Sequence, residues 1–257
     1  AIDSGATLDF IWENRLALFY VMLDGAHFMT REESWKEVKL GRIFKASEHL
    51  ELSGKRNWIR QSSYISHLGG HKKFLEKLEY YILELKNIVI VGDGAPWIWE
   101  WAKANFPDQI QILDFFHAME HLCKFGKIYF KDEITRSAWI EVQKKLLLED
   151  GVELVIEAID TLPKTKSKTK EAEKEKLRNY YSKNRCRMRY KTYLDKGLMI
   201  GSGPIEAAHR SVLQKRLKLS GQRWTRKGLQ AVANLRTLEK SKQWEHMVQL
   251  VQTKKAA

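Results

Sequence analysis

Three acidic residues of this chain lie beside glycines at the ends of apolar segments. Asp24 is followed by a glycine, Asp93 lies between two glycines, and Glu206 follows a Gly-Ser-Gly-Pro-Ile segment. Glycine lets a backbone approach a ligand closely, and hard divalent cations prefer carboxylate ligands held on rigid elements. Two such cations about 3.5–4 Å apart catalyse phosphoryl transfer. The three acids therefore predict a metal site that acts on nucleic-acid phosphates.

Each acid also has a purely structural explanation. Asp24 and Gly25 together are typical of a hairpin turn. Asp93 is placed to cap a helix that begins near Pro96. Glu206 falls in the first turn of a predicted helix, where an acid is favoured by the helix dipole.

A second pattern is the Asp-Phe-Phe-His segment at 114–117. If Asp114 ends a strand, both it and His117 face the metal site, and His117 positions a phosphate or a proton. Alternatively, His117 is a partly buried helix histidine bonded to backbone. His117, Glu120 and His121 also match the H-x-x-E-H pattern of inverted zinc peptidases, in which the two histidines bind zinc. A zinc peptidase would leave the high positive net charge of the chain, +13, without a function.

The formal net charge is +13, which favours a polyanionic partner because basic side chains neutralise phosphates and release counterions. A basic segment over 164–191 is either a DNA-contacting arm or a solvated helix face or linker. The candidate phosphate contacts are Lys164, Lys166, Lys168, Lys170, Arg185, Arg187, Arg189, Arg210, Lys215, Arg216 and Lys218.

Cysteine content and hydropathy point to a cytoplasmic protein with no membrane partner. Cys123 and Cys186 are far apart and form no Cys-x-x-Cys pair, which fits a reducing compartment. No segment approaches the roughly 18–20 apolar residues of a membrane span. The chain begins at Ala1 rather than at methionine, so we expect a processed, cloned or truncated piece of a longer protein.

Hydrophobic periodicity predicts the elements that position these residues. We expect an antiparallel start, followed by strands and helices in alternation and then by helices alone over 131–197. A further helix begins near Pro204, and Thr225 caps the last one. The predicted strands are 16–24, 36–44, 57–66, 88–91 and 109–113, and the predicted helices include 70–86 and 97–105.

Several blocks in this order resemble bacterial insertion-sequence transposases of the DDE type. The blocks are residues 21–25, 35–41, 92–99, 112–122, 201–208 and 214–224. The resemblance covers about residues 16–245. Full-length members usually carry an additional N-terminal DNA-binding region.

The resemblance implies a ribonuclease-H-like α/β fold, a mixed sheet flanked by helices with an all-α insertion before the last catalytic helix. It divides the chain into a first core part (1–130), a basic helical insertion (131–197) and the completion of the core (198–257). Asp24, Asp93 and Glu206 would be catalytic and would bind two Mg²⁺ or Mn²⁺ ions. Asp114 and His117 match the D-x-x-H pattern beside such active sites.

The expected activity is cleavage of DNA at element ends, followed by transfer of the 3′-hydroxyl into target DNA. The expected partners are DNA and further copies of the chain in a homo-oligomer. A nuclease with the same fold and an inactive DNA-binding remnant are the alternatives.

Overall fold

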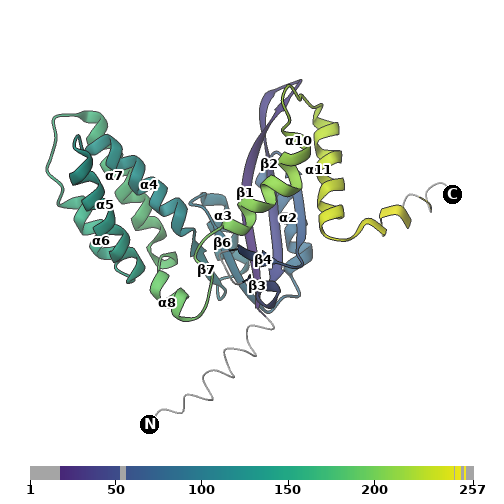
Figure 1. The fold of residues 1–257 in the computed structure, drawn as a ribbon, viewed down its shortest axis with the longest axis horizontal. Helices are drawn as coiled ribbons and strands as arrows, with labels where there is room; N and C mark the ends of the chain where they lie inside the picture. Colours follow the sequence, from purple (N-terminus) through teal and green to yellow (C-terminus); the bar gives the residue numbers. More distant parts are fainter. Residues whose placement is uncertain (1–17, 53–55, 246, 250–251, 253–257) are drawn as a thin grey trace, which may run out of the picture. The chain divides into compact units, whose positions relative to one another are not determined.

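The structure is a computed structural model that describes residues 18–52, 56–245, 247–249 and 252. Strands and helices form the predicted α/β arrangement (Figure 1). In chain order the elements are β1 (Leu18–Thr30), β2 (Ser34–Lys45), η1 (Ala46–Glu48), β3 (His49–Leu52), β4 (Arg56–Ile59), β5 (Ser63–Leu68), α2 (His71–Ile82), β6 (Asn87–Gly92), α3 (Pro96–Asn105), β7 (Ile110–Leu113), α4 (Phe115–Tyr129), α5 (Glu133–Leu148), α6 (Val152–Asp160), α7 (Lys168–Asn184), η2 (Arg185–Arg187), α8 (Tyr190–Asp195), α9 (Gly203–Ala208), η3 (His209–Gln214), α10 (Lys215–Leu217) and α11 (Arg226–Lys240).

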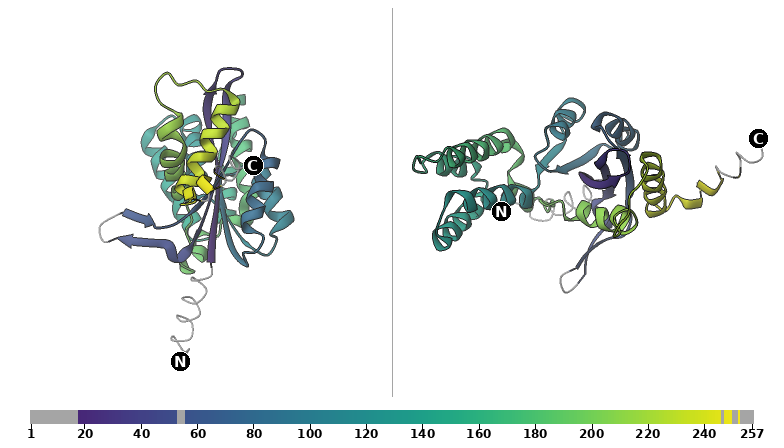
Figure 2. Two further views of the ribbon diagram at one scale, coloured as in Figure 1. Left: turned by 90° about the vertical axis from the view of Figure 1, so that its right-hand side faces the viewer. Right: turned by 90° about the horizontal axis from the view of Figure 1, so that it is seen from above.

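The main sheet has five strands in the order β5-β2-β1-β6-β7. Strands β1, β2 and β5 pair antiparallel, as the sequence predicts. Helix α3 connects the neighbouring strands β6 and β7. Strands β3 and β4 form a separate two-stranded hairpin that projects from the five-stranded sheet (Figure 2).

Two predictions about the strands are wrong. Asp24 and Gly25 do not form a turn, because β1 continues through them to Thr30 with unbroken pairing to β2. Burial at alternate positions, Ala26, Phe28 and Thr30, stabilises this extension. The single strand predicted over 57–66 is instead two strands, β4 and β5.

The chain divides into two compact units. The first contains Ala1–Ile90, Trp101–Ile110 and Gly203–Ala257, and the second contains Val91–Glu100 and Gln111–Ser202. Strands β6 and β7 each contribute residues to both units. No helix in the described part of the chain has the length and apolar character needed to cross a membrane.

In the first unit, helices cover both faces of the antiparallel strands. Phe74 and Leu78 of α2 lie against Gly41 of β2, where an added Cβ atom would be 3.3 Å from each side chain. The opposite face of these strands packs against α9 and η3. Helix α11 protects the edge strand β5, whose Tyr64 and Leu68 amides donate to side chains of Ser241 and Gln230.

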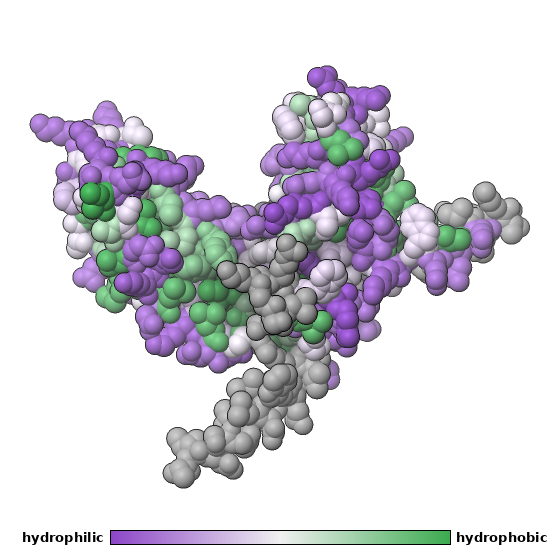
Figure 3. Space-filling view, in the orientation of Figure 1, coloured by the Kyte–Doolittle hydropathy of each residue, from purple (hydrophilic) through white to green (hydrophobic). Residues whose placement is uncertain are grey.

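The second unit consists largely of helices α4 to α8, in agreement with the absence of strands predicted over 131–197. Its core includes Leu147, Val155, Leu177 and Tyr181, all buried. The Tyr181 hydroxyl donates to the Ala118 carbonyl over 2.9 Å and so connects α7 to α4. Figure 3 shows hydrophobic residues on the visible face of these helices, surrounded by hydrophilic ones.

Candidate active site

Asp24 lies in the middle of β1 and presents a partly exposed carboxylate. It is opposite Leu40 in the pairing register, so its side chain lies on the face of the sheet that carries Leu40 and Arg42. Its Oδ1 accepts a hydrogen bond from the Gly25 amide over 2.7 Å. Its Oδ2 lies 3.3 Å from Nε2 of His209, and 27% of its side chain is exposed. Asp24 is therefore oriented by protein groups and still accessible to solvent.

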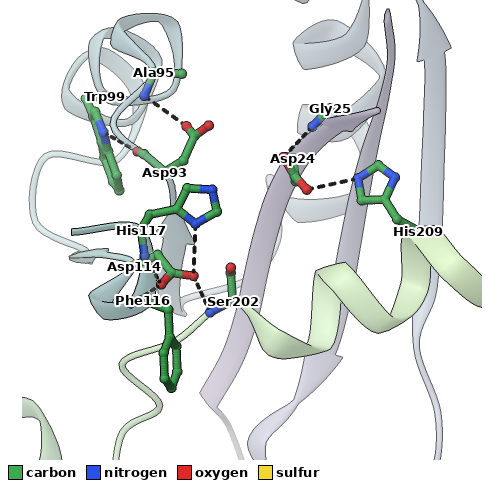
Figure 4. A network of polar contacts seen from close by, with 10 residues as sticks. All are labelled: Asp24, Gly25, Asp93, Ala95, Trp99, Asp114, Phe116, His117, Ser202 and His209. Atoms are coloured by element: carbon green, nitrogen blue, oxygen red, sulfur yellow. Dashed lines mark hydrogen bonds and ion pairs between the residues drawn. The ribbon is translucent and has the colours of Figure 1, made fainter. Parts of the chain in front are cut away.

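His209 is a buried histidine of the first unit that lies beside Asp24. It is buried, and neither ring nitrogen has a hydrogen-bond partner with good geometry among the described residues. Desolvation by burial lowers the pKa of His209 to about 4, against the opposing effects of the Asp24 backbone and the Glu37 carboxylate. The imidazole beside Asp24 is consequently neutral near pH 7. Figure 4 shows its ring directed toward the Asp24 carboxylate.

A π-helical turn, η3, carries His209. Arg236 of α11 donates from Nε to the Val212 carbonyl over 3.0 Å and from Nη2 to the Ser211 carbonyl over 2.8 Å. These bonds satisfy backbone oxygens within the turn. Short π-helical segments are rare and are frequent at functional sites.

Glu206 lies in the first turn of α9, one turn before His209, and is exposed. The start of this helix is fixed to β2, because buried Arg42 donates to the Pro204 carbonyl over 2.7 Å and to Ser62 over 3.0 Å. Helix α9 is thus anchored to the sheet at Pro204, and the turn after it contacts Asp24 through His209. The first unit therefore brings the Glu206 helix onto the strands beside Asp24.

Asp93 belongs to the second unit and follows β6 directly. Its Oδ1 accepts from the Ala95 amide over 2.8 Å, and its carbonyl accepts from the Trp99 indole over 2.8 Å. The structural explanation of Asp93 is thus correct in part, because its carboxylate stabilises the turn that precedes α3. Gly94 is needed here, since an added Cβ atom would lie 2.3 Å from the Tyr180 ring.

Asp114 is fully buried at the N-terminus of α4. Its Oδ1 accepts from the amides of Phe116 and His117 over 2.6 and 3.0 Å. Its Oδ2 accepts from the Ser202 amide over 2.6 Å (Figure 4). Three backbone donors therefore occupy this carboxylate, whose main task is to hold the backbone in place.

His117 lies next to Asp114 and is partly exposed. Its Nδ1 is 3.8 Å from Asp114 Oδ2, beyond hydrogen-bond distance. Nδ1 has no hydrogen-bond partner among the residues that the structure describes. Nδ1 of His117 therefore does not bond to a backbone group of the described residues, unlike in the alternative interpretation. This nitrogen is buried, whereas 30% of the side chain as a whole is exposed.

Tyr180 and His121 lie near this pair within the second unit. Their rings stack with centroids 4.0 Å apart. Burial, reinforced by the charge of Asp93, raises the pKa of Tyr180, and its hydroxyl has no hydrogen-bond partner in the described ranges. Burial and His117 lower the pKa of His121. Sequence reasoning missed Tyr180, whose position on α7 relative to Gly94 only the fold reveals.

No group of three or more His, Cys, Asp or Glu side chains that could hold a metal ion occurs within the described residues. This finding applies equally to His117, Glu120 and His121 of the zinc peptidase alternative and to the three predicted acids. Of the three acids predicted from the sequence, Asp24 and Glu206 belong to the first unit and Asp93 to the second.

A comparison with protein families gives one match that covers most of the chain. Residues 11–254 match the model of an uncharacterised protein family, UPF0236. The chain belongs to the UPF0236 family. A comparison with curated proteins finds no match.

The basic residues predicted to contact DNA fall into two groups in this UPF0236 member. Some have structural roles: Lys170 donates to the Tyr129 carbonyl, Arg187 stacks 4.7 Å from the Trp99 ring, and Lys218 lies 5.7 Å from the Trp35 ring. The others are exposed and form no ion pair with a described residue: Lys164, Lys166, Lys168, Arg185, Arg189, Arg210, Lys215 and Arg216.

Proposed function

We propose that this chain is the catalytic domain of a DDE-type DNA transposase with a ribonuclease-H-like fold. The observation that carries the proposal is the packing of the first unit. Asp24 and the helix of Glu206 are distant in sequence, yet the contacts of His209 with Asp24 and of Arg42 with Pro204 hold that helix on β1 and β2. Two of the three predicted acids thus lie on neighbouring elements of one packed unit.

The chemistry of the acids fits a pair of hard cations. All three offer carboxylate oxygens, the ligands that Mg²⁺ and Mn²⁺ prefer. Asp24 is partly exposed and Glu206 is exposed, so neither carboxylate is enclosed by the protein. Asp24, Asp93 and Glu206 would hold the ions. When bound, the ions activate the attacking oxygen and stabilise the leaving oxygen of a phosphodiester.

Other residues of the chain have supporting roles in this proposal. Asp114 fixes the backbone of Phe116, His117 and Ser202, and the partly exposed imidazole of His117 contacts the phosphate. The exposed lysines and arginines contribute phosphate contacts, which attract DNA without regard to sequence. A net charge of +13 agrees with such a partner.

The direct test compares conservative variants of the three acids. Asp24→Asn, Asp93→Asn and Glu206→Gln are each expected to reduce Mg²⁺-dependent nicking of supercoiled plasmid at least about a hundredfold, because each removes a charged ligand. Asp108→Asn is the matched control, since Asp108 is exposed and lies outside the candidate site. Full nicking activity in Asp93→Asn contradicts the proposal.

A second assay separates transposase from nuclease. Labelled duplexes with free 3′-hydroxyl ends are incubated with plasmid, and covalent joining is measured on denaturing gels. Joining that depends on the three acids supports a transposase. Nicking without joining indicates a nuclease of the same fold, and salt-sensitive DNA binding without either reaction indicates an inactive remnant.

A further inference from the structure

His209 is a buried polar side chain that no structural role yet explains. Buried polar groups in folded proteins nearly always have hydrogen-bond partners, and leaving one unpaired costs about 1–3 kcal/mol. His209 is 3% exposed, and its ring nitrogens lack a well-aligned partner among the described residues. The Asp24 carboxylate lies close to the ring, with Oδ2 3.3 Å from Nε2 of His209.

We propose that His209 is a positioning residue for Asp24: its Nε2 lies 3.3 Å from Oδ2, so that a small turn of the ring lets Nε2–H donate to this oxygen and set the orientation of the carboxylate. This inference rests on the proposed function, in which Asp24 binds a cation. It assigns no contact between His209 and the substrate.

The Asp24 carboxylate has a neighbouring donor at each of its two oxygens. The Gly25 amide donates to Oδ1, and His209 approaches Oδ2 from the other side (Figure 4). Gly25 also leaves room for the Glu37 side chain, since an added Cβ atom would lie 2.0 Å from Glu37 Oε1. A carboxylate that has a neighbouring donor at each oxygen loses less orientational entropy when it binds a cation.

The fold holds the imidazole firmly in this place. His209 begins the π-helical turn η3, and the bonds from Arg236 of α11 fix the carbonyls of that turn. Glu206 lies three residues earlier on the same continuous helical segment. Its position and that of the Asp24 carboxylate are therefore coupled through His209.

The proposal distinguishes the two nitrogens of the ring, which gives a matched pair of variants. The amide nitrogen of glutamine reaches the place of Nε2, whereas that of asparagine reaches only the place of Nδ1. His209→Asn and His209→Ala are expected to raise the Mg²⁺ concentration for half-maximal nicking by about tenfold, as losses of outer-shell partners typically do. His209→Gln is expected to stay within about threefold of the wild type.

Thermal unfolding of all three variants controls for a loss of structure. A merely structural histidine predicts that the shift in Mg²⁺ dependence follows the loss of Tm, with glutamine no better than asparagine. That pattern, or an unchanged Mg²⁺ dependence in His209→Ala, overturns the proposal.

Nuclear magnetic resonance of the ¹⁵N-labelled ring tests the contact without any DNA. The His209→Gln spectrum identifies the His209 signals by their absence. We expect the Nε2-protonated tautomer, with the Nε2 resonance displaced in Asp24→Asn and again on addition of Mg²⁺ to the wild type. A His209 resonance that is indifferent to Asp24→Asn refutes the positioning role. A displaced resonance in a protein that never cleaves DNA supports the positioning role and refutes the proposed function alone.

Discussion

Two aspartate–histidine pairs in the described part of the chain have opposite burial. In the first unit the His209 side chain is 4% exposed and that of Asp24 is 27% exposed. In the second unit the Asp114 side chain is 0% exposed and that of His117 is 30% exposed. In our proposal the enclosed member of each pair has a structural or orienting task, and the more exposed member faces the ligand. The same two residue types thus carry out opposite tasks, and burial decides which.

The largest expected difference between the pairs is in stability. Asp114→Ala removes the acceptor of three backbone amides, and hydrogen bonds to a charged group contribute about 1.5–3 kcal/mol each. We expect the free energy of unfolding of the variant to fall by at least about 3 kcal/mol. Asp24→Asn changes a partly exposed group without changing its shape, so a change within about 1 kcal/mol is expected.

Urea unfolding followed by fluorescence of the nine tryptophans measures both values. The comparison between the pairs fails if Asp24→Asn destabilises the protein as strongly as Asp114→Ala.

The second difference concerns pH. Burial lowers the pKa of His209 to about 4, below its value of 6.5 in the unfolded chain. Between these values the unfolded chain binds more protons than the folded protein. The contribution of His209 to stability is therefore present above pH 6.5 and is lost as the pH falls toward 4, by up to about 3 kcal/mol.

The charged groups that face the His209 ring are Asp24 of β1 and Glu37 of β2. His67 and His121 also have lowered pKa values, so the difference between His209→Gln and the wild type isolates the effect. Unfolding is measured in urea at intervals from pH 7 to pH 4.5. We expect the free energy of unfolding of His209→Gln to fall less over this range than that of the wild type. If the two proteins lose stability in parallel as the pH falls, the lowered pKa of His209 is not the cause.

Much of the fold was predictable from local sequence, and the errors have physical causes. The alternation of apolar residues in β2 and the periodicity of α2 depend on neighbouring residues. Strand β2 contains the predicted range 36–44, whereas α2 ends at Ile82, before the predicted end at residue 86. The Asp24–Gly25 pair was assigned to a turn because glycine is common in turns. In the protein Gly25 instead gives space to Glu37 within a continuous strand.

The candidate site was predictable only in part, because several of its contacts join residues that are far apart in the sequence. Local sequence patterns do not reveal such contacts. Asp114 was predicted as a strand-end residue beside the site, but it is a helix cap whose third donor, the Ser202 amide, is distant in sequence. His209 lies on a turn whose π-helical form is supported by Arg236 of another helix. Neither contact follows from residue spacing, so His209 was missed although Glu206, three residues earlier, was identified.

The smallest expected effect is seen when two adjacent tyrosines of α7 are compared. The comparison tests whether the Tyr180 hydroxyl of the second unit contacts a ligand. Tyr181→Phe removes the hydrogen bond that the Tyr181 hydroxyl donates to the Ala118 carbonyl, and we expect a loss of about 1–2 kcal/mol in unfolding free energy. Tyr180→Phe removes a hydroxyl that has no partner in the described part of the chain, so stability should change by less than about 0.5 kcal/mol or rise slightly. If the hydroxyl contacts substrate beside Asp93, nicking by Tyr180→Phe falls about tenfold while that by Tyr181→Phe does not. Equal destabilisation by the two variants means that Tyr180 has an internal partner and that its hydroxyl belongs to the packing of the unit.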